Sequence, residues 1–226
     1  MSERPIRAVL FDWGDTLFES PHAPAVILDV ARARGAAIGP DDARRIWNEL
    51  WDAGKTPEEH AKGRDLSMEA HRRVWTALFR RADDRVPGIA DALYERVMDP
   101  SRWVPYPDTE PTLAALRQRG VRIGIVSNHA YDLRAFFAAK GLDRYIDAYA
   151  LSFEVGAPKP AREIFLAACR MLGSRPDETL MVGDDPVSDG GAGGAGLRVF
   201  ILPPHDARGS ARGLDAVVAL VDRSRP

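Results

Sequence analysis

The sequence predicts an α/β protein with an open, doubly wound and mostly parallel sheet, interrupted by an inserted helical domain. Three observations lead to this prediction. Short apolar runs alternate with amphipathic segments over most of the chain, as in doubly wound sheets. The runs are rich in β-branched residues and lack strict alternation, which is typical of strands covered on both faces. One long segment, residues 18–104, has helical periodicity only.

Four segments are predicted to be parallel strands. They are IRAVLF before Asp12, VRIGIVS ending at Ser127, TLMVG ending before Asp184, and LRVFIL from Leu197. A weaker fifth strand is expected at DAYALS. Helices are expected between them at EPTLAALRQRG, AYDLRAFFAAKG and AREIFLAACRMLG. The first and last of these end on glycine, a common residue at helix C-termini.

The segment between the first and second strands is predicted to be a helical insert. Its apolar residues recur at three- and four-residue spacing, which indicates packing faces. They include Ile46, Leu50, Trp51, Val74, Trp75, Leu78 and Phe79. The proline-rich VPYPDTEP marks the return to the sheet. We therefore expect a core of residues 1–17 and 105–226 and an inserted domain of residues 18–104.

The composition favours a small-molecule partner. The chain has 226 residues, with 31 Lys and Arg against 33 Asp and Glu, so its formal net charge is only -2. Such a balance provides no electrostatic footprint for nucleic acid or an anionic membrane. The first apolar run is too short for a signal peptide or a membrane span, so we expect a cytoplasmic protein. The sequence does not distinguish a monomer from a homodimer.

Polar residues follow the predicted strands at the edge where open α/β sheets bind ligands. Asp12, Gly14, Asp15 and Thr16 follow the first strand, and Ser127, Asn128 and His129 follow the second. Lys159 lies in GAPKP, and Asp184, Asp185 and Asp189 follow the next strand. Taken alone, an aspartate after a strand is more often a turn or capping residue than a nucleophile.

The order and spacing of these residues resemble the four motifs of the haloacid dehalogenase superfamily. The family pattern is an Asp-rich loop after the first strand, a Ser or Thr after the second, a Lys, and a Gly-Asp followed by another Asp. Asp12, Ser127, Lys159, Asp184 and Asp189 match it in order. The resemblance implies a Rossmann-like core, a mobile helical cap that selects the substrate, and Mg²⁺ as cofactor.

The resemblance also implies a phosphatase that acts on a small phosphorylated metabolite through an aspartyl-phosphate intermediate. Asp12 would be the nucleophile, and Lys159 would place a cation against Asp12 and the phosphate. Mg²⁺ prefers oxygen ligands, so Asp12, Asp184 and the Gly14 carbonyl form a partial shell, with Asp189 as a further ligand or an outer-shell orienter.

Several polar groups are candidates for binding the phosphate. Ser127 and the amides around Asn128 can donate hydrogen bonds to phosphate oxygens, and Thr16 either does the same or braces the loop. His129 follows them at a strand end and is a candidate substrate contact. The other four histidines lack metal-ligand spacing and are predicted to lie on the surface: His22, His60, His71 and His205.

One position departs from the family's phosphatases. The residue two beyond the nucleophile is usually a second Asp, which protonates the leaving group and later activates water. Here it is Gly14, and Asp15 follows where phosphatases commonly have glycine. Either Asp15 is a displaced acid, or it is a turn residue and the acid is lost. A positioned acid contributes about 10²- to 10⁴-fold, so its loss would favour acyl and aryl phosphates.

Three alternatives remain open from the sequence. A dehalogenase would also use Asp12 but does not require Mg²⁺, so the retained Asp184 and Asp189 argue against it. Phosphonate cleavage would need a cap lysine as a Schiff base, and nothing marks Lys55 or Lys62 for that role. A family member that binds a phosphorylated ligand without turnover is the non-enzymatic alternative.

The single cysteine, Cys169, is predicted to be a buried packing residue.

Overall fold

The computed structural model describes residues 4–205 and 207–225 and divides into two compact units. The first unit is formed by Met1–Glu19 together with Val104–Pro226, and the second by Ser20–Trp103. Each unit has its own secondary structure and its own core, so the two are described separately.

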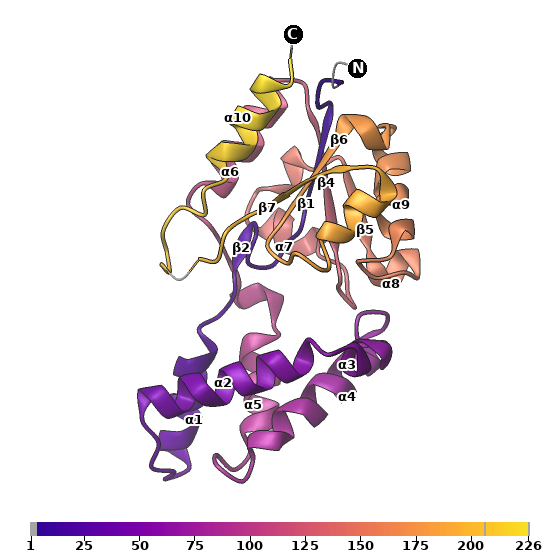
Figure 1. Ribbon diagram of the computed structural model, residues 1–226. Helices are drawn as coiled ribbons and strands as arrows, with labels where there is room; N and C mark the ends of the chain where they lie inside the picture. Colours follow the sequence, from indigo (N-terminus) through magenta and orange to yellow (C-terminus); the bar gives the residue numbers. More distant parts are fainter. Residues whose placement is uncertain (1–3, 206, 226) are drawn as a thin grey trace. The chain divides into compact units, whose positions relative to one another are not determined.

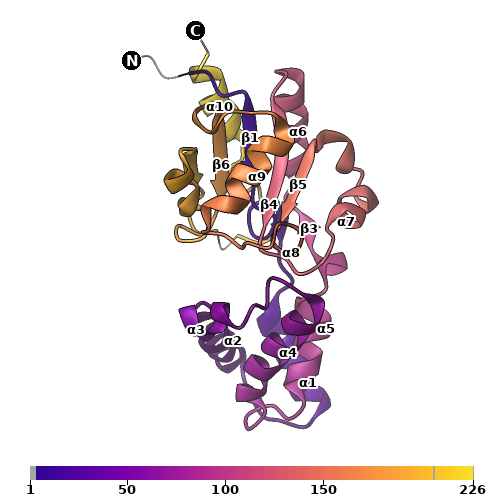
Figure 2. The same cartoon turned by 90° about the vertical axis from the view of Figure 1, so that its right-hand side faces the viewer.

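The first unit contains a five-stranded parallel sheet (Figures 1 and 2). Its strands are β1 (Ala8–Phe11), β4 (Arg122–Ser127), β5 (Ala148–Leu151), β6 (Thr179–Gly183) and β7 (Arg198–Ile201). Their order is β5-β4-β1-β6-β7. All five predicted strands are therefore confirmed, including the weak one. Along the chain, β4 and then β5 are added on one side of β1, and β6 and then β7 are added on the other side. The strand order therefore reverses at β1.

Helices cover both faces of this sheet, which explains why β1 and β6 are buried at every position. Helices α6 (Thr109–Gln118) and α10 (Asp215–Arg223) lie on one side, and α9 (Arg162–Leu172) lies on the other (Figure 1). Apolar residues of β1, β4 and β6 form a core with α9, where Ile164, Phe165 and Cys169 are buried. The prediction that Cys169 is a packing residue is thus confirmed. Shorter helices are α7 (Arg134–Ala139) and α8 (Ser152–Val155).

A two-stranded antiparallel ribbon belongs to the first unit and lies where the chain leaves and re-enters it. β2 (Phe18–Glu19) pairs with β3 (Val104–Pro105), with Phe18 opposite Pro105 and Glu19 opposite Val104. The sequence shows no convincing strand there, because two residues are too few to produce a periodic pattern.

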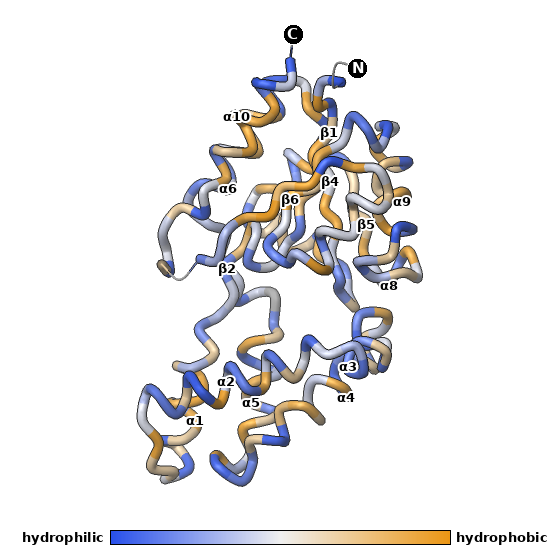
Figure 3. The backbone as a smooth tube through the Cα atoms, in the orientation of Figure 1, coloured by the Kyte–Doolittle hydropathy of each residue, from blue (hydrophilic) through white to orange (hydrophobic). Residues whose placement is uncertain are grey.

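The second unit is entirely helical in the part of the chain that the structure describes. It contains α1 (Ala23–Ala33), α2 (Pro40–Gly54), α3 (Pro57–Ala61), α4 (Met68–Phe79) and α5 (Ile89–Val97). Hydrophobic and hydrophilic residues alternate along these helices, as amphipathic helices require (Figure 3). Ser67 caps α4 through a hydrogen bond from the Ala70 amide, and Thr56 caps α3 through the Glu59 amide.

The predicted packing residues form the core of this helical unit. Ile46, Leu50, Val74, Leu78 and Phe79 are all buried. Aromatic rings continue the core along α2 and α4, since Trp51 stacks on Trp47 and on Trp75 at ring-centroid distances of 5.2 and 5.8 Å. Full burial of each large apolar side chain contributes about 1.5–3 kcal/mol, so this core stabilises the unit through its own contacts.

One of the four histidines expected on the surface is buried, so that prediction was wrong for His71. Only 5% of His71 is exposed, and its Nδ1 lies 2.9 Å from the Tyr94 hydroxyl. The partner of this ring nitrogen, Tyr94, lies 23 residues further along the chain, and the sequence has no pattern that would reveal such a pair. Among the described residues, no helix is long and apolar enough to cross a membrane.

Candidate active site

The carboxyl ends of β1, β4 and β6 bring the predicted site residues to one edge of the sheet. Asp12 directly follows β1, and its amide donates to the Val182 carbonyl of β6 at 2.9 Å. Ser127 is the last residue of β4, and Asp184 follows β6. Because β1 is flanked by β4 and β6, these residues lie where the strand order reverses, the place where open α/β sheets bind ligands.

Lys159 joins two of the carboxylates. Its Nζ donates to Asp12 Oδ1 and to Asp189 Oδ1, each at 2.6 Å. Only 3% of the Lys159 side chain is exposed. Burial lowers the pKa of this ammonium. The charges of Asp12 and Asp189 raise it by more than burial lowers it, so the pKa of Lys159 lies above its ordinary value. Lys159 is therefore a permanent positive charge inside the site.

Asp189 is fully buried, and both of its carboxylate oxygens are occupied. Oδ1 accepts from Lys159, and Oδ2 accepts from the Asp185 amide at 3.0 Å. Gly183 makes room for this carboxyl group, because a Cβ at position 183 would overlap it. Asp185 in turn accepts from the amides of Val187 and Ser188, so it caps a turn, which is the commoner role of an aspartate after a strand.

The three carboxylates form a cluster that suits a hard cation. One oxygen from each of Asp12, Asp184 and Asp189 lies within 4.8 Å of the others. Burial raises the pKa of Asp12 to about 8, with Asp189 and Asp184 adding to the rise and Lys159 opposing it. Burial also raises the pKa of Asp184 to about 6, with contributions from Asp15 and Asp189. One ammonium does not offset three carboxylates, so an additional cation would be stabilised here.

The residues after Asp12 form a tight loop. Thr16 is fully buried, and its hydroxyl donates to Asp184 Oδ1 at 3.3 Å, so it braces the site. Asp15 adopts a left-handed conformation with φ of 52°, and its amide donates to the Phe18 carbonyl at 2.7 Å. The charge of Asp15 acts on Asp184 and on Tyr106, since it raises the pKa of both groups in addition to their burial.

Asn128 contacts the backbone of Lys159 through both ends of its amide. Its Nδ2 donates to the Lys159 carbonyl at 2.9 Å, and its Oδ1 accepts from the Lys159 amide at 2.6 Å. This pair fixes the segment that carries the lysine against the end of β4. The side chain of Asn128 thus holds Lys159, a contact that the sequence did not predict.

Ser127 and His129 lie on either side of Asn128 and are both buried. In the part of the chain that the structure describes, the Ser127 hydroxyl makes no protein hydrogen bond, so it is available to a ligand. The His129 ring packs between Trp13 and Tyr131, at ring-centroid distances of 5.1 and 4.0 Å. The His129 backbone is held by Ser152, whose hydroxyl accepts from its amide at 2.9 Å.

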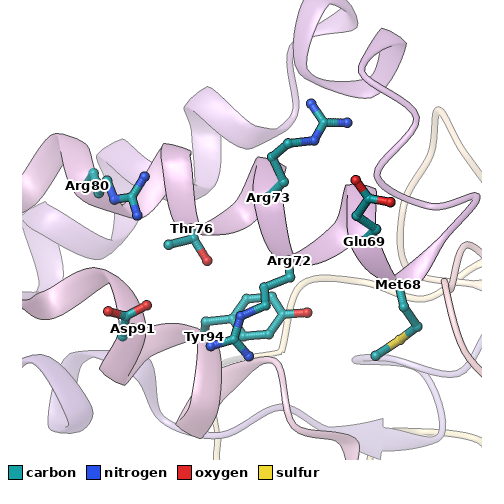
Figure 4. Close-up of a pocket in the computed structure, with 8 residues that line it drawn as sticks. All are labelled: Met68, Glu69, Arg72, Arg73, Thr76, Arg80, Asp91 and Tyr94. Atoms are coloured by element: carbon teal, nitrogen blue, oxygen red, sulfur yellow. The ribbon is translucent and has the colours of Figure 1, made fainter.

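The helical unit has a pocket of its own, of about 620 Å³, on the surface of α4 and α5 (Figure 4). Its lining is Met68, Glu69, Arg72, Arg73, Thr76, Arg80, Asp91 and Tyr94. The Arg72 guanidinium lies over the Tyr94 ring, 5.0 Å from its centroid. The three arginines are exposed and are accompanied by two carboxylates, which is the pattern of a hydrated helix face.

The two lysines of this unit lack the environment of a Schiff-base residue. Lys62 is half exposed and forms an ion pair with Glu59 at 2.8 Å. Lys55 is exposed and lies over the Trp51 ring at 5.7 Å. A lysine that forms a Schiff base at neutral pH is normally desolvated to lower its pKa, so neither residue supports phosphonate cleavage.

Comparison with known proteins supports a hydrolase. The family model for haloacid dehalogenase-like hydrolases matches residues 6–196. A ribulose-1,5-bisphosphate 5-phosphatase from Halopiger xanaduensis is 29% identical over 215 residues, covering 92% of this chain and 89% of its own. A phosphoserine phosphatase from Thermus thermophilus is 29% identical over 235 residues, covering 91% of this chain and 93% of its own.

The fold is also shared with a dehalogenase. The structure of an L-2-haloacid dehalogenase from Xanthobacter autotrophicus is similar, with a TM-score of 0.63 and 24% identity, over 96% of this chain and 88% of its own. At this identity the similarity shows the fold alone. The reaction must therefore be argued from the side chains at the strand ends.

Proposed function

The chain belongs to the haloacid dehalogenase-like hydrolases, and from this we propose that it is a Mg²⁺-dependent phosphatase that acts on a small phosphorylated metabolite. The observation that carries the proposal is the cluster of Asp12, Asp184 and Asp189, in which Lys159 forms ion pairs with Asp12 and with the buried Asp189. Displacement of a halide from carbon requires one carboxylate nucleophile and no metal. A cluster of three carboxylates with one ammonium is better suited to a cation and a phosphate.

The cluster fits Mg²⁺ by the chemistry of its donors, since all of them are oxygens. Asp12 and Asp184 would hold the ion together with the Gly14 carbonyl. We assign Asp189 to orienting Lys159 instead, because both of its oxygens already accept hydrogen bonds. When bound, Mg²⁺ would offset the charges of the carboxylates and of the phosphate oxygens.

In the first step, a carboxylate oxygen of Asp12 attacks phosphorus while the bond from phosphorus to the leaving oxygen breaks. The product is an aspartyl-phosphate and the released alcohol or acid. Lys159 stays protonated throughout and offsets charge on Asp12 and on the transferred group. The Ser127 hydroxyl and the amides that follow it would donate to the phosphate oxygens, which keeps phosphorus in line with Asp12.

In the second step, water attacks phosphorus of the aspartyl-phosphate, which releases inorganic phosphate and regenerates the Asp12 carboxylate. In both steps a proton must be moved near the leaving or attacking oxygen. Gly14 has no side chain that could transfer this proton. The charge of the neighbouring Asp15 acts on the carboxyl group of Asp184, whose pKa it raises in addition to burial. We therefore propose that substrates with acidic leaving groups, such as acyl or aryl phosphates, are turned over faster than sugar phosphates.

The helical unit would serve as the cap that excludes bulk water during transfer. The two phosphatases compared above are named for different substrates, a sugar bisphosphate and an amino-acid phosphate. Their names therefore support a small phosphorylated substrate and do not select one.

The proposal is tested by phosphate release from aryl, acyl and sugar phosphates, with and without Mg²⁺. Asp12→Asn is the matched variant, because it keeps the side-chain shape and removes the nucleophile. Release that needs both Mg²⁺ and Asp12 supports the proposal. Halide release from a 2-haloacid without Mg²⁺, in place of phosphate release, would assign the chain to dehalogenation.

A further inference from the structure

Asp15 adopts a backbone conformation that residues with a Cβ disfavour, although aspartate enters it more readily than most. Its φ of 52° makes it the only non-glycine residue with positive φ among those that the structure describes. In this region the Cβ of an L-residue crowds the backbone, which is why glycine usually takes such positions. Contacts with the surroundings must therefore hold Asp15 there.

Two hydrogen bonds hold the backbone of Asp15 on both sides. Its amide donates to the Phe18 carbonyl at 2.7 Å, and its carbonyl accepts from Arg212 Nε at 2.7 Å. Phe18 is a near neighbour in the sequence, whereas Arg212 comes from the loop before α10. The arginine is thus the long-range restraint on this turn.

Arg212 is itself firmly anchored. Only 4% of the residue is exposed, and its Nη1 donates to the Pro203 carbonyl at 2.9 Å. Its backbone amide donates to Asp108 Oδ1 at 2.8 Å, while Asp108 Oδ2 accepts from the amides of Gly213 and Leu214. The guanidinium therefore reaches Asp15 from a rigid support.

The conformation of Asp15 determines where the Gly14 carbonyl points. The Gly14 carbonyl and the Asp15 amide share one planar trans peptide, so they point in opposite directions. Because the amide is bound to Phe18, the carbonyl is directed away from Phe18. A rotation of Asp15 out of the left-handed region would turn this peptide and move the carbonyl.

We propose that Arg212 is a positioning residue that holds Asp15 in its left-handed conformation and thereby orients the Gly14 carbonyl toward a bound divalent cation. This inference rests on the proposed function for the cation and for the Gly14 carbonyl as its ligand. It adds a residue far along the chain to the site, and it explains how Asp15 occupies a place that suits glycine.

A purely electrostatic role is the competing explanation, because the positive charge of Arg212 also acts on Asp184. Burial raises the pKa of the Asp184 carboxyl, and the charges of Lys159 and Arg212 lower it. Lysine would keep the charge at position 212 without the planar fork that reaches both Asp15 and Pro203. Arg212→Lys therefore separates the two roles.

The test is calorimetric titration of Mg²⁺ into substrate-free protein, which does not depend on turnover. We expect Arg212→Met and Arg212→Lys each to weaken Mg²⁺ binding by about tenfold, the lower end of the effect of outer-shell residues. Wild-type affinity in either variant would overturn the proposal. Thermal unfolding of each variant shows whether it is folded, and Arg212→Lys serves if Arg212→Met is not.

Substitutions at Asp15 make the test specific to the backbone. In an Asp15→Gly background the left-handed conformation is unstrained, so Arg212→Met should weaken Mg²⁺ binding by less than about twofold. In an Asp15→Ala background, which removes the same carboxylate but keeps a Cβ, the tenfold loss should remain. An equal loss in both backgrounds would overturn the proposal. If wild-type protein binds Mg²⁺ in this way but releases no phosphate, the proposed function fails and the positioning role stands.

Discussion

Lys159 Nζ lies 2.6 Å from Asp189 Oδ1 in a part of the core where Asp189 has no exposed surface. The same ammonium reaches Asp12 at an equal distance. The loop before α9, the turn after β6 and the end of β1 are therefore held together by one charged group. Since Asp189 is the most deeply buried member, small changes around it should affect the whole site.

We expect Gly183→Ala to disrupt the site although residue 183 itself has no reactive group. A Cβ there overlaps the Asp189 carboxyl group, so Asp189 and with it Lys159 must move. Overpacking of this kind costs about 1–3 kcal/mol of stability, and phosphate release should fall at the same time. Gly194→Ala is the control, because nothing lies within 4 Å of a Cβ at that position. If the two variants show equal activity and equal thermal unfolding, this account of Gly183 is wrong.

Asn128 is expected to affect the rate more than substrate binding. Asn128→Ala removes both hydrogen bonds to the Lys159 backbone, so the lysine loses its precise position. Misplacement of a catalytic group by about 1 Å costs about 10²-fold, so kcat should fall by about 10- to 100-fold while KM changes little. A variant with normal kcat and a raised KM would instead mean that Asn128 binds substrate directly.

Gly14→Asp should improve turnover of poor leaving groups. The substitution places a carboxyl group two residues beyond Asp12, where it can donate a proton to the leaving oxygen. We expect sugar-phosphate turnover to rise by about tenfold or more and aryl-phosphate turnover to change little, since a well-positioned general acid typically contributes about 10²- to 10⁴-fold. Gly14→Asn is the matched control without an acid. Equal effects of Asp and Asn would show that no proton donor is missing.

The stability of the helical unit should depend on pH through His71. Burial lowers the pKa of His71 to about 4, with Arg64 adding to this and Asp65 opposing it. The unfolded chain takes up a proton at this residue below about pH 6.5. Between pH 6.5 and 4 the unfolded state thus binds more protons, so the free energy of unfolding falls as the pH falls.

The expected loss is on the order of 3 kcal/mol, because a tenfold difference in proton affinity corresponds to about 1.4 kcal/mol. Urea unfolding of wild-type protein, His71→Gln and the exposed-site control His22→Gln at pH 7 and pH 4.5 measures it. His71→Gln should flatten the pH dependence relative to the other two. Parallel profiles for all three proteins would mean that His71 binds its proton equally in the folded and unfolded states, and that its pKa is not lowered by folding.

The fold was predictable because its elements leave patterns in the sequence. The run before Asp12 and the run ending at Ser127 are short, largely apolar and rich in β-branched residues, which is typical of parallel strands covered on both faces. Trp75 and Phe79 recur at helical spacing and are buried in the helical unit. The candidate site was predictable because Asp12, Asp184 and Lys159 stand at or near strand ends in an order typical of one family.

Contacts between distant segments left no such pattern. Arg212 lies in a loop without periodicity, and its partner Asp15 is 197 residues away in the sequence. The pair formed by His71 and Tyr94 is equally invisible, so a buried histidine was expected on the surface. Asn128 shows a third case, since its residue type suits a phosphate contact as well as the Lys159 backbone. Side-chain partners of this kind are decided by packing in three dimensions.

Capture of a covalent intermediate on Asp12 tests the proposed phosphatase reaction most directly. Protein mixed with an acyl or aryl phosphate and Mg²⁺ is quenched in acid within one turnover, and its peptides are analysed by mass spectrometry. We expect phosphate on the peptide that contains Asp12, and none on this peptide in Asp12→Asn or in protein without Mg²⁺. Phosphate release by Asp12→Asn at the wild-type rate, or a phosphoryl group on another residue, would contradict it.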